Sequence, residues 1–390
     1  MFELGNTYTT VNQTASAIKT YDQLIAEYAK GSYTSKAILR QGLIYYNEDK
    51  DELALTKFKK VAAEFPRTDE ANEAVKTARL IYVDKGRVEE YATWVKTLDF
   101  VEVTDAELDN DSWEAAEKQF AQGNTQQAIA NLKSYVNSFP NGLHALMANY
   151  YLADLYYKQG DTSSSIPYYE YLISKSRNEH TEQALSRLSE IYVKKNELNK
   201  AIPVLTRLEM ESDFPQNKTY AQANLMKAFY DKKDYAQAVV YADKVLANPK
   251  TDTKIKSDAQ IIVARSAIQV GDEIKAREGY AKLQKIAKGE LMAEALYYDS
   301  YFKNKDGKFE ASNTVVQKIA KEYSGYKYYG AKSLIVMAKN FYGLKDSFQA
   351  TYILESVIKN FSQFNDVVTE AQTELDKIKA EEAKTNSSVK

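Results

Sequence analysis

The sequence contains no cysteine, and this excludes a disulfide framework, thiolate metal sites and thiol catalysis. Its two histidines, His144 and His180, are too few for a histidine-rich metal site. Lysine and arginine (52) nearly balance aspartate and glutamate (54), so the chain lacks the positive charge that holds nucleic acid. With 14 glycines and 6 prolines in 390 residues, it is also unlike a set of strands joined by glycine-rich turns.

Long apolar runs are missing as well. No stretch approaches the roughly 20 apolar residues that a membrane-spanning helix needs. The first residues, MFELGNTYTT, have neither the basic region nor the apolar stretch of a signal peptide. We therefore expect no membrane insertion by this segment. Its 390 residues exceed one ordinary core and indicate several domains or a repeat array.

Tyrosine is abundant, with 31 copies, and one tyrosine-rich stretch suggests how the chain is built. In residues 137–161, NSFPNGLHALMANYYLADLYYKQGD, the residues Leu146, Tyr150 and Leu155 form a helical stripe before a glycine turn. A second apolar stripe follows over residues 166–173. The stretch therefore predicts a helical hairpin.

The same hairpin pattern recurs along the chain. A small residue in each second helix is followed four positions later by a larger apolar residue in most units. The pairs are Ala17 with Tyr21, Ala54 with Phe58, Ala128 with Leu132, Ser165 with Tyr169, Ala201 with Leu205, Ala238 with Ala242, Ala276 with Tyr280, Ala311 with Val315 and Ala350 with Leu354. Nine steps of 37 residues separate Ala17 from Ala350, with a double step over one degenerate unit. This period predicts an all-α, right-handed α-α superhelix of about ten helix-turn-helix repeats.

The prolines fit this period. Pro66, Pro140 and Pro215 each follow a phenylalanine, where we expect a second helix to end. Pro167 and Pro203 are expected in the first turns of their helices, where a missing amide costs little.

These repeats resemble the tetratricopeptide repeat. The resemblance rests on matches in four units: Leu4-Gly5, Tyr8, Ala17 and Tyr21; Gly42, Tyr45, Ala54, Phe58 and Pro66; Leu152-Ala153 and Tyr156; and Leu188-Ser189, Tyr192 and Ala201. The 37-residue period is longer than the family's usual 34 or so. Long units ending in EFP, SFP or DFP are similar to those of Gram-negative envelope proteins, such as the TolA-binding protein and outer-membrane assembly lipoproteins. That resemblance implies a periplasmic or outer-membrane-associated parent protein, with a cytoplasmic location as the alternative.

We expect five segments along the chain. Residues 1–98 form N-terminal repeats, of which the first is truncated and the third degenerate, and residues 99–111 form an acidic connecting segment. Residues 112–364 form a second block of repeats, 365–382 a capping helix and 383–390 a disordered tail. Because the chain begins within a repeat, we expect the parent protein to continue upstream.

A search for catalytic motifs finds no phosphate-binding loop, HExxH or GxSxG. The alternating carboxylates Asp105, Glu107, Asp109, Asp111 and Glu114 resemble a calcium loop but lack its turn glycine. A helix cap formed by Asp111 or Ser112 is the favoured interpretation.

The two histidines lack nearby partners in the sequence, and we expect surface or capping roles for both. The sequence thus predicts no catalytic residue, no metal site and no cofactor.

Paired aromatic residues close several first helices: Tyr45-Tyr46, Tyr156-Tyr157, Phe229-Tyr230 and Phe341-Tyr342. Adjacent helical residues point about 100° apart, so the first member packs within the repeat while the second faces the concave wall or the next repeat. The candidates for partner binding are Tyr46, Trp113, Phe120, Tyr150, Tyr157, Tyr230 and Tyr342. Packing between repeats is the alternative role for each.

The resulting functional hypothesis is a non-catalytic scaffold that binds a protein or peptide along a tyrosine-rich concave surface, as part of a larger cell-envelope protein. Two alternatives stay open: a solenoid that senses a peptide or glycan, and a docking arm of an upstream enzyme domain.

Overall fold

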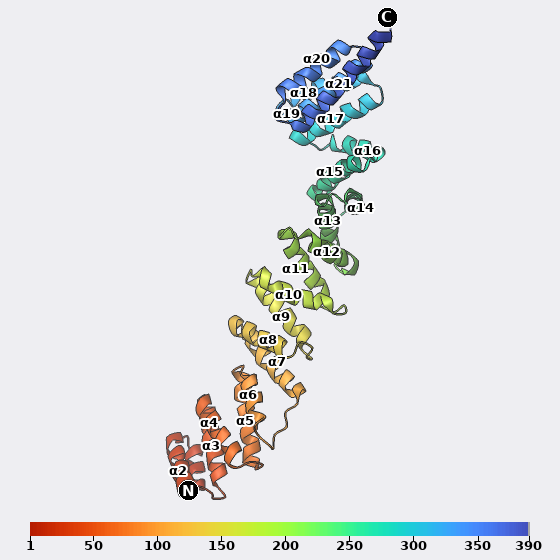
Figure 1. Ribbon diagram of the computed structural model, residues 1–390. Coiled ribbons are helices and arrows are strands. Elements are labelled where there is room, and N and C mark those ends of the chain that lie inside the picture. Colours follow the sequence, from red (N-terminus) through yellow and green to blue (C-terminus); the bar gives the residue numbers. More distant parts are fainter. Residues whose placement is uncertain (389–390) are drawn as a thin grey trace. The chain divides into compact units, whose positions relative to one another are not determined.

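Helices are the only regular structure in residues 1–388, the part of the chain that the computed structural model describes. Twenty-one α-helices follow one another there, and most of them pack on their neighbours in sequence (Figure 1). The prediction of an all-α repeat fold is confirmed. The contacts divide the chain into two compact units, Met1–Leu188 and Ser189–Lys390.

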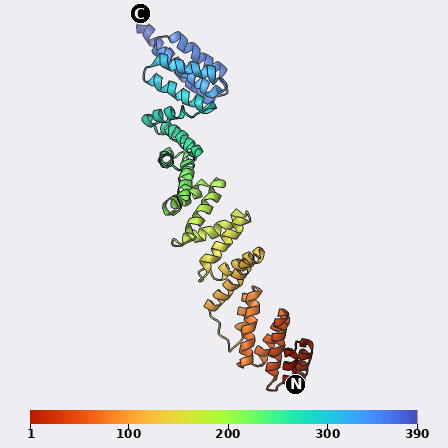
Figure 2. The ribbon, with the colours of Figure 1, turned by 180° about the vertical axis from the view of Figure 1, so that it is seen from behind.

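The first unit consists of five helix pairs and the start of an eleventh helix. Its helices are α1 (Phe2–Thr10), α2 (Thr14–Glu27), α3 (Thr34–Asn47), α4 (Asp51–Glu64), α5 (Asp69–Asp84), α6 (Val88–Val95), α7 (Asp105–Ala121), α8 (Thr125–Ser138), α9 (Ala145–Lys158), α10 (Thr162–Ser174) and α11 (Thr181–Lys194), which continues into the second unit. Figures 1 and 2 both show the connection between α6 and α7 as a long irregular segment.

The second unit repeats this pairing and ends in a single long helix. Its helices are α12 (Leu198–Glu211), α13 (Pro215–Asp231), α14 (Tyr235–Ala247), α15 (Thr253–Val270), α16 (Glu273–Leu283), α17 (Gly289–Lys305), α18 (Phe309–Glu322), α19 (Lys327–Gly343), α20 (Ser347–Asn360) and α21 (Asn365–Ser388). First helices of adjacent pairs also contact each other, as α17 contacts α19.

The turn inside each helix pair carries one residue in the left-handed region, with φ between 56° and 81°. These residues are Asn12, Asp49, Gly86, Gly123, Gly160, Asn196, Lys233, Gly271, Gly307 and Lys345. They are 36 to 38 residues apart and mark ten pairs without a gap, because Gly86 supplies the turn of the degenerate third unit. Glycine, asparagine and aspartate adopt this geometry at low cost, so the turn sets the period even where the apolar pattern weakens.

Small residues of the second helices lie buried against the first helices. In each of the first two helix pairs, a glycine of the first helix lies against an aromatic ring of the second helix. A Cβ added at Gly5 would lie 2.4 Å from Tyr21, and one at Gly42 would lie 2.5 Å from Phe58. Both rings are fully buried, so these glycines allow the two helices to approach.

One assignment in this series is wrong by a single residue. The pair Ala311 with Val315 is replaced by Ser312 with Val316, which are 0% and 1% exposed, whereas Ala311 is exposed. The Ser312 hydroxyl donates to the carbonyl oxygen of Ser300 in the preceding helix at 2.7 Å. A serine can occupy this small site because that bond satisfies its hydroxyl.

The acidic connecting segment expected over residues 99–111 is also wrong in its extent. Helix α7 begins at Asp105, and residues 96–104 form the connection. Thr104 and Glu107 form a capping box, in which each side chain bonds the backbone of the other. This box starts the helix two turns before the apolar pattern becomes visible at Trp113, and it excludes the predicted capping role of Asp111 or Ser112.

Three prolines occupy positions different from those predicted. Pro215 is the first residue of α13 and does not end α12. Pro167 and Pro203 lie in the second turns of α10 and α12, inside the helix and not in the first turn. In α10 the Asp161 cap, which accepts from the backbone of Ser164 at 3.1 Å, fixes the earlier start.

The end of the described chain is more helical than predicted. The expected capping helix over 365–382 is α21, which extends to Ser388, so residues 383–388 belong to a helix and not to a disordered tail. Residues 389–390 of the predicted tail lie outside the described residues. Val367, Ala371, Leu375 and Ile378 pack against α19 and α20.

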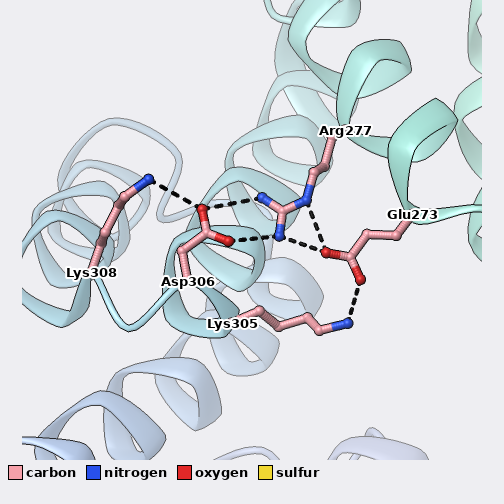
Figure 3. Close-up of polar contacts among 5 residues, drawn as sticks. All are labelled: Glu273, Arg277, Lys305, Asp306 and Lys308. Carbon is pink, nitrogen blue, oxygen red and sulfur yellow. Dashed lines mark hydrogen bonds and ion pairs between the residues drawn. The ribbon is translucent and has the colours of Figure 1, made fainter.

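A surface network of charges joins neighbouring pairs in the second unit (Figure 3). The guanidinium of Arg277 in α16 donates to Glu273 at 2.6 Å and to Asp306, which follows α17, at 2.9 Å. Lys305 pairs with Glu273, and Lys308 pairs with Asp306, so that positive and negative side chains alternate through the network. All these groups are about a third or more exposed, so each pair contributes at most about 1 kcal/mol and mainly orients the turn.

Among residues 1–388, no helix has both the length and the apolar character required to cross a membrane.

Candidate partner-binding site

Aromatic rings from two successive first helices, α7 and α9, and from the turns before α9 and α11 form one connected group in the first unit. The ring of Phe120 in α7 stacks on Tyr151 in α9, with centroids 3.9 Å apart and planes 6° from parallel. Tyr151 also stacks on Trp113 at 5.7 Å. Tyr150 stacks on His180, which precedes α11, at 3.8 Å. We call this group the aromatic array: Trp113, Phe120, His144, Tyr150, Tyr151 and His180.

Only part of the array is buried. Trp113 is 8% exposed and belongs to the core around Tyr135 and Leu152. Phe120, Tyr150 and Tyr151 are half-buried. Their rings therefore both hold adjacent repeats together and keep apolar edges accessible to another molecule. Packing between repeats, the alternative role that the sequence left open, therefore occurs in these residues, and partner binding stays a prediction.

A buried polar network holds one end of the array in place. The carboxylate of Asp109 accepts from the Tyr135 hydroxyl and, at 2.7 Å, from the backbone amide of Leu143. The Tyr135 hydroxyl in turn accepts from the backbone amide of His144 at 3.0 Å. His144 thus lies flat against Trp113, with ring centroids 5.0 Å apart. Burial and the hydrogen bond to Asp109 raise the pKa of Tyr135, so its hydroxyl stays protonated.

At the other end of the array, one buried polar atom lacks a hydrogen-bond partner in the described chain. The Tyr150 hydroxyl donates to the side-chain oxygen of Gln183 at 3.1 Å. Burial lowers the pKa of His180, which favours the neutral ring. Its Nε2 lies 3.5 Å from a Glu179 oxygen, yet it makes no hydrogen bond. A separation of 3.5 Å between this nitrogen and oxygen is too long for a good hydrogen bond.

The other four predicted candidates lie apart from the array. Tyr157, also on α9, lies beneath the guanidinium of Arg187 at 4.4 Å, and its hydroxyl accepts from that group at 3.0 Å. Tyr46 packs against the core of the first unit. Tyr230 and Tyr342 belong to the second unit.

In the second unit these two tyrosines have different surroundings. Tyr230 meets Tyr235 edge-on at 5.7 Å, at the start of the next helix. The Tyr342 hydroxyl donates to Glu381 at 2.7 Å, and this bond raises the pKa of Tyr342 to about 12. The first members of the aromatic pairs pack within their repeats, as the helical geometry predicts. Tyr156 stacks on Tyr168 at 5.9 Å, with planes 5° from parallel.

The acidic residues near residue 110 serve the structure. Asp111, 0% exposed, accepts two hydrogen bonds from the Arg79 guanidinium in α5, one of them at 2.8 Å. Asp109 is bound to Tyr135, and Glu107 caps its own helix. Within residues 1–388 no group of three or more histidine or acidic side chains is placed to hold a metal ion.

Sequence reasoning missed Tyr151 and underestimated both histidines. Tyr151 is the centre of the array, and it follows Tyr150 just as Tyr157 follows Tyr156. A second aromatic pair on one helix was therefore the available signal. His144 and His180 precede α9 and α11 by one residue each, 36 residues apart. His144 is the N-cap residue of α9, as expected, but its side chain makes no capping hydrogen bond. Both histidines are ring-stacking members of the array.

Two family models of the tetratricopeptide repeat match the chain, one over residues 36–68 and one over residues 114–180. These parts of the chain are therefore similar to tetratricopeptide repeats. The second match contains every member of the array except Trp113, which immediately precedes it. Among the curated proteins, none matches this sequence.

Solved structures of repeat proteins resemble the chain at low sequence identity. The tetratricopeptide domain of P58(IPK) is 14% identical over 98% of this chain and 97% of that chain, with a TM-score of 0.31. Yeast Tom70 is 11% identical over 98% and 95%, with a TM-score of 0.33. A repeat protein from Parabacteroides merdae is 14% identical over 68% and 98%, with a TM-score of 0.31. At these scores the likeness supports no inference about function.

Proposed function

We propose that this protein is a non-catalytic scaffold that binds a partner protein or peptide through the half-buried rings of the aromatic array. The observation that carries the proposal is the continuous stacking of Phe120, Tyr151 and Trp113, with part of the rings left accessible. Large rings fixed by stacking offer contact area with little loss of conformational entropy on binding. Stacked helical pairs are, in addition, a common architecture for binding extended partners.

The proposal predicts that Phe120→Leu combined with Tyr151→Leu removes partner binding while the chain stays folded. Loss of two anchoring rings costs at least about 2 kcal/mol of binding free energy, or roughly 30-fold in affinity. Loss of their stacking costs only about 0.5–1.5 kcal/mol of stability. Proteins captured from a lysate of the source cells by immobilised wild-type and variant chains are compared by quantitative mass spectrometry.

A matched control is available on α20. Phe348 and Tyr352 are 76% and 64% exposed, so Phe348→Leu with Tyr352→Leu makes the same chemical change outside the array. We expect the control to retain the proteins that the array variant loses, with circular dichroism unchanged for both. Equal retention by the two variants would show that the partner binds elsewhere.

We also propose that the parent protein is located in the cell envelope, on the similarity of its lengthened repeats to those of Gram-negative envelope proteins. An export signal at the start of the parent sequence is the feature that this placement requires, and a parent without one would exclude it.

A further inference from the structure

A groove of about 850 Å³ lies between α5, the connection over residues 96–104 and the start of α7, entirely within the first unit. Its volume falls within the range typical of ligand sites. Buried Val75 and Tyr91 and half-buried Phe100, Val101 and Val103 supply its apolar lining. This α5–α7 groove shares no residue with the aromatic array.

The walls of the groove are fixed. The paired hydrogen bonds of Arg79 to Asp111 join α5 to α7 across it. Arg67 also pairs with Asp99 of the connection at 2.9 Å, as an exposed surface pair. The capping box at Thr104 holds its end, where the backbone is extended. A site that is already ordered loses less entropy when it binds a ligand.

The middle of the connection lacks backbone hydrogen bonds, whereas Thr97, Leu98 and Thr104 near its two ends make them. Within the described chain, no hydrogen bond involves the N–H or C=O groups of residues 100–103. Phe100 lies in a turn and packs against the core of the unit. After it, Val101 and Val103 pack against the core while Glu102 is exposed, the alternation of an extended strand. Such a segment presents its polar groups as the edge of a sheet does, ready to pair with another strand.

Negative charge surrounds this free edge. Five carboxylates line the groove against two cations. Asp111 is neutralised by Arg79, and Glu107 is engaged in the capping box. The remaining carboxylates, Asp69, Glu73 and Glu102, are exposed and have no ion-pair partner within residues 1–388, and only Lys76 offsets them. A cationic ligand is therefore favoured over an anionic one.

We propose that the α5–α7 groove is a second docking site, which binds an extended segment of a partner protein in which apolar residues alternate with lysine or arginine. The segment pairs its backbone with residues 100–103, places its apolar side chains on the lining and directs its cations to Asp69, Glu73 and Glu102. Backbone pairing provides affinity and the carboxylates select the charge, as in other complexes formed by strand addition. The inference does not depend on the function proposed for the array.

The probe is a fluorescein-labelled, end-blocked peptide of about six alternating valine and lysine residues, long enough to span residues 100–103. Its binding to the full chain is measured by fluorescence anisotropy at low salt. We expect replacement of its lysines with glutamate to abolish binding. Ester bonds in place of alternate amides should weaken binding about ten-fold, because each removes one backbone donor.

Charge reversal in the protein tests the location of the site. Glu73→Lys with Glu102→Lys should weaken binding of the peptide at least about ten-fold. Glu310→Lys with Glu322→Lys makes the same charge change at exposed positions of the second unit and should leave affinity within about two-fold. Hydrogen exchange supplies a direct readout: bound peptide should slow exchange of the amides of residues 100–103 at least about ten-fold.

Several results would overturn the proposal. Equal weakening by both charge-reversed variants would mean that the peptide responds only to net charge. Unchanged affinity of the ester peptide, or unprotected amides at residues 100–103, would exclude strand addition. Equally tight binding of the glutamate peptide would exclude the charge selection.

Discussion

Replacing Arg265 with methionine is expected to destabilise the second unit by about 3–5 kcal/mol. Its guanidinium donates to both oxygens of Glu294 in the next first helix, at 2.9 and 2.6 Å, and the pairing raises the pKa of Arg265 above its ordinary value. The Tyr280 hydroxyl donates to the same carboxylate at 2.9 Å. The Glu294 side chain is 3% exposed and that of Arg265 41%, so removal of the arginine leaves a buried charge that water cannot reach.

The asymmetry of the pair supplies the controls. Glu294→Gln should cost only about 1 kcal/mol, because water can solvate the half-exposed arginine and the amide oxygen still accepts from Tyr280. Arg265→Met with Glu294→Met should recover much of the loss, since no buried charge remains.

Urea unfolding and native-state hydrogen exchange in α15 and α17 together measure this effect, because long repeat arrays do not unfold as one unit. If Glu294→Gln proves as damaging as Arg265→Met, the cost comes from lost packing or hydrogen bonds and not from a stranded charge.

The second large effect is expected at Phe58. Its ring is fully buried in the core formed by helices α3 to α7, and Phe58→Ala should cost about 3–5 kcal/mol through lost burial and the cavity left behind. Gly42→Ala should cost about 1–3 kcal/mol, because its Cβ would lie 2.5 Å from the Phe58 ring. Once the ring is removed the clash is gone, so Gly42→Ala should be close to neutral in the Phe58→Ala background.

Urea unfolding of the four chains in this double-mutant cycle measures the coupling. Phe348→Ala, which removes a ring that is 76% exposed, should change stability by no more than about 0.5 kcal/mol and serves as the control. Additive costs at Gly42 and Phe58 would contradict the close approach of α3 and α4 at this glycine.

The repeat period was predictable because two independent features encode it. Small residues that allow close approach of helices recur, and so do residues that accept a left-handed turn. The second feature survives where the first fails: Gly86 preserves the turn of the third pair, although the apolar pattern of α6 is short. Element boundaries were less predictable, since the capping box at Thr104 begins α7 well before its apolar stripe appears.

The surroundings of the candidate residues could not be derived from helical spacing alone. That rule placed Tyr150 and Phe120 on the side facing the concave wall or the next repeat, and in the structure they contact His180 and Tyr151. It could not foresee these partners, because they come from the following first helix or the turn before it. Buried polar contacts were equally hidden: Arg79 and Asp111 are 32 residues apart and look like ordinary surface charges in the sequence.

Photo-crosslinking in the source cells shows most directly whether the aromatic array contacts a partner. A benzophenone amino acid is placed at Tyr151 and, as a matched control, at Tyr352, which is 64% exposed and lies outside the array. The account predicts that light couples the chain to one or a few discrete proteins from position 151 and not from position 352. Discrete products from position 352 alone, or none from position 151, would contradict it.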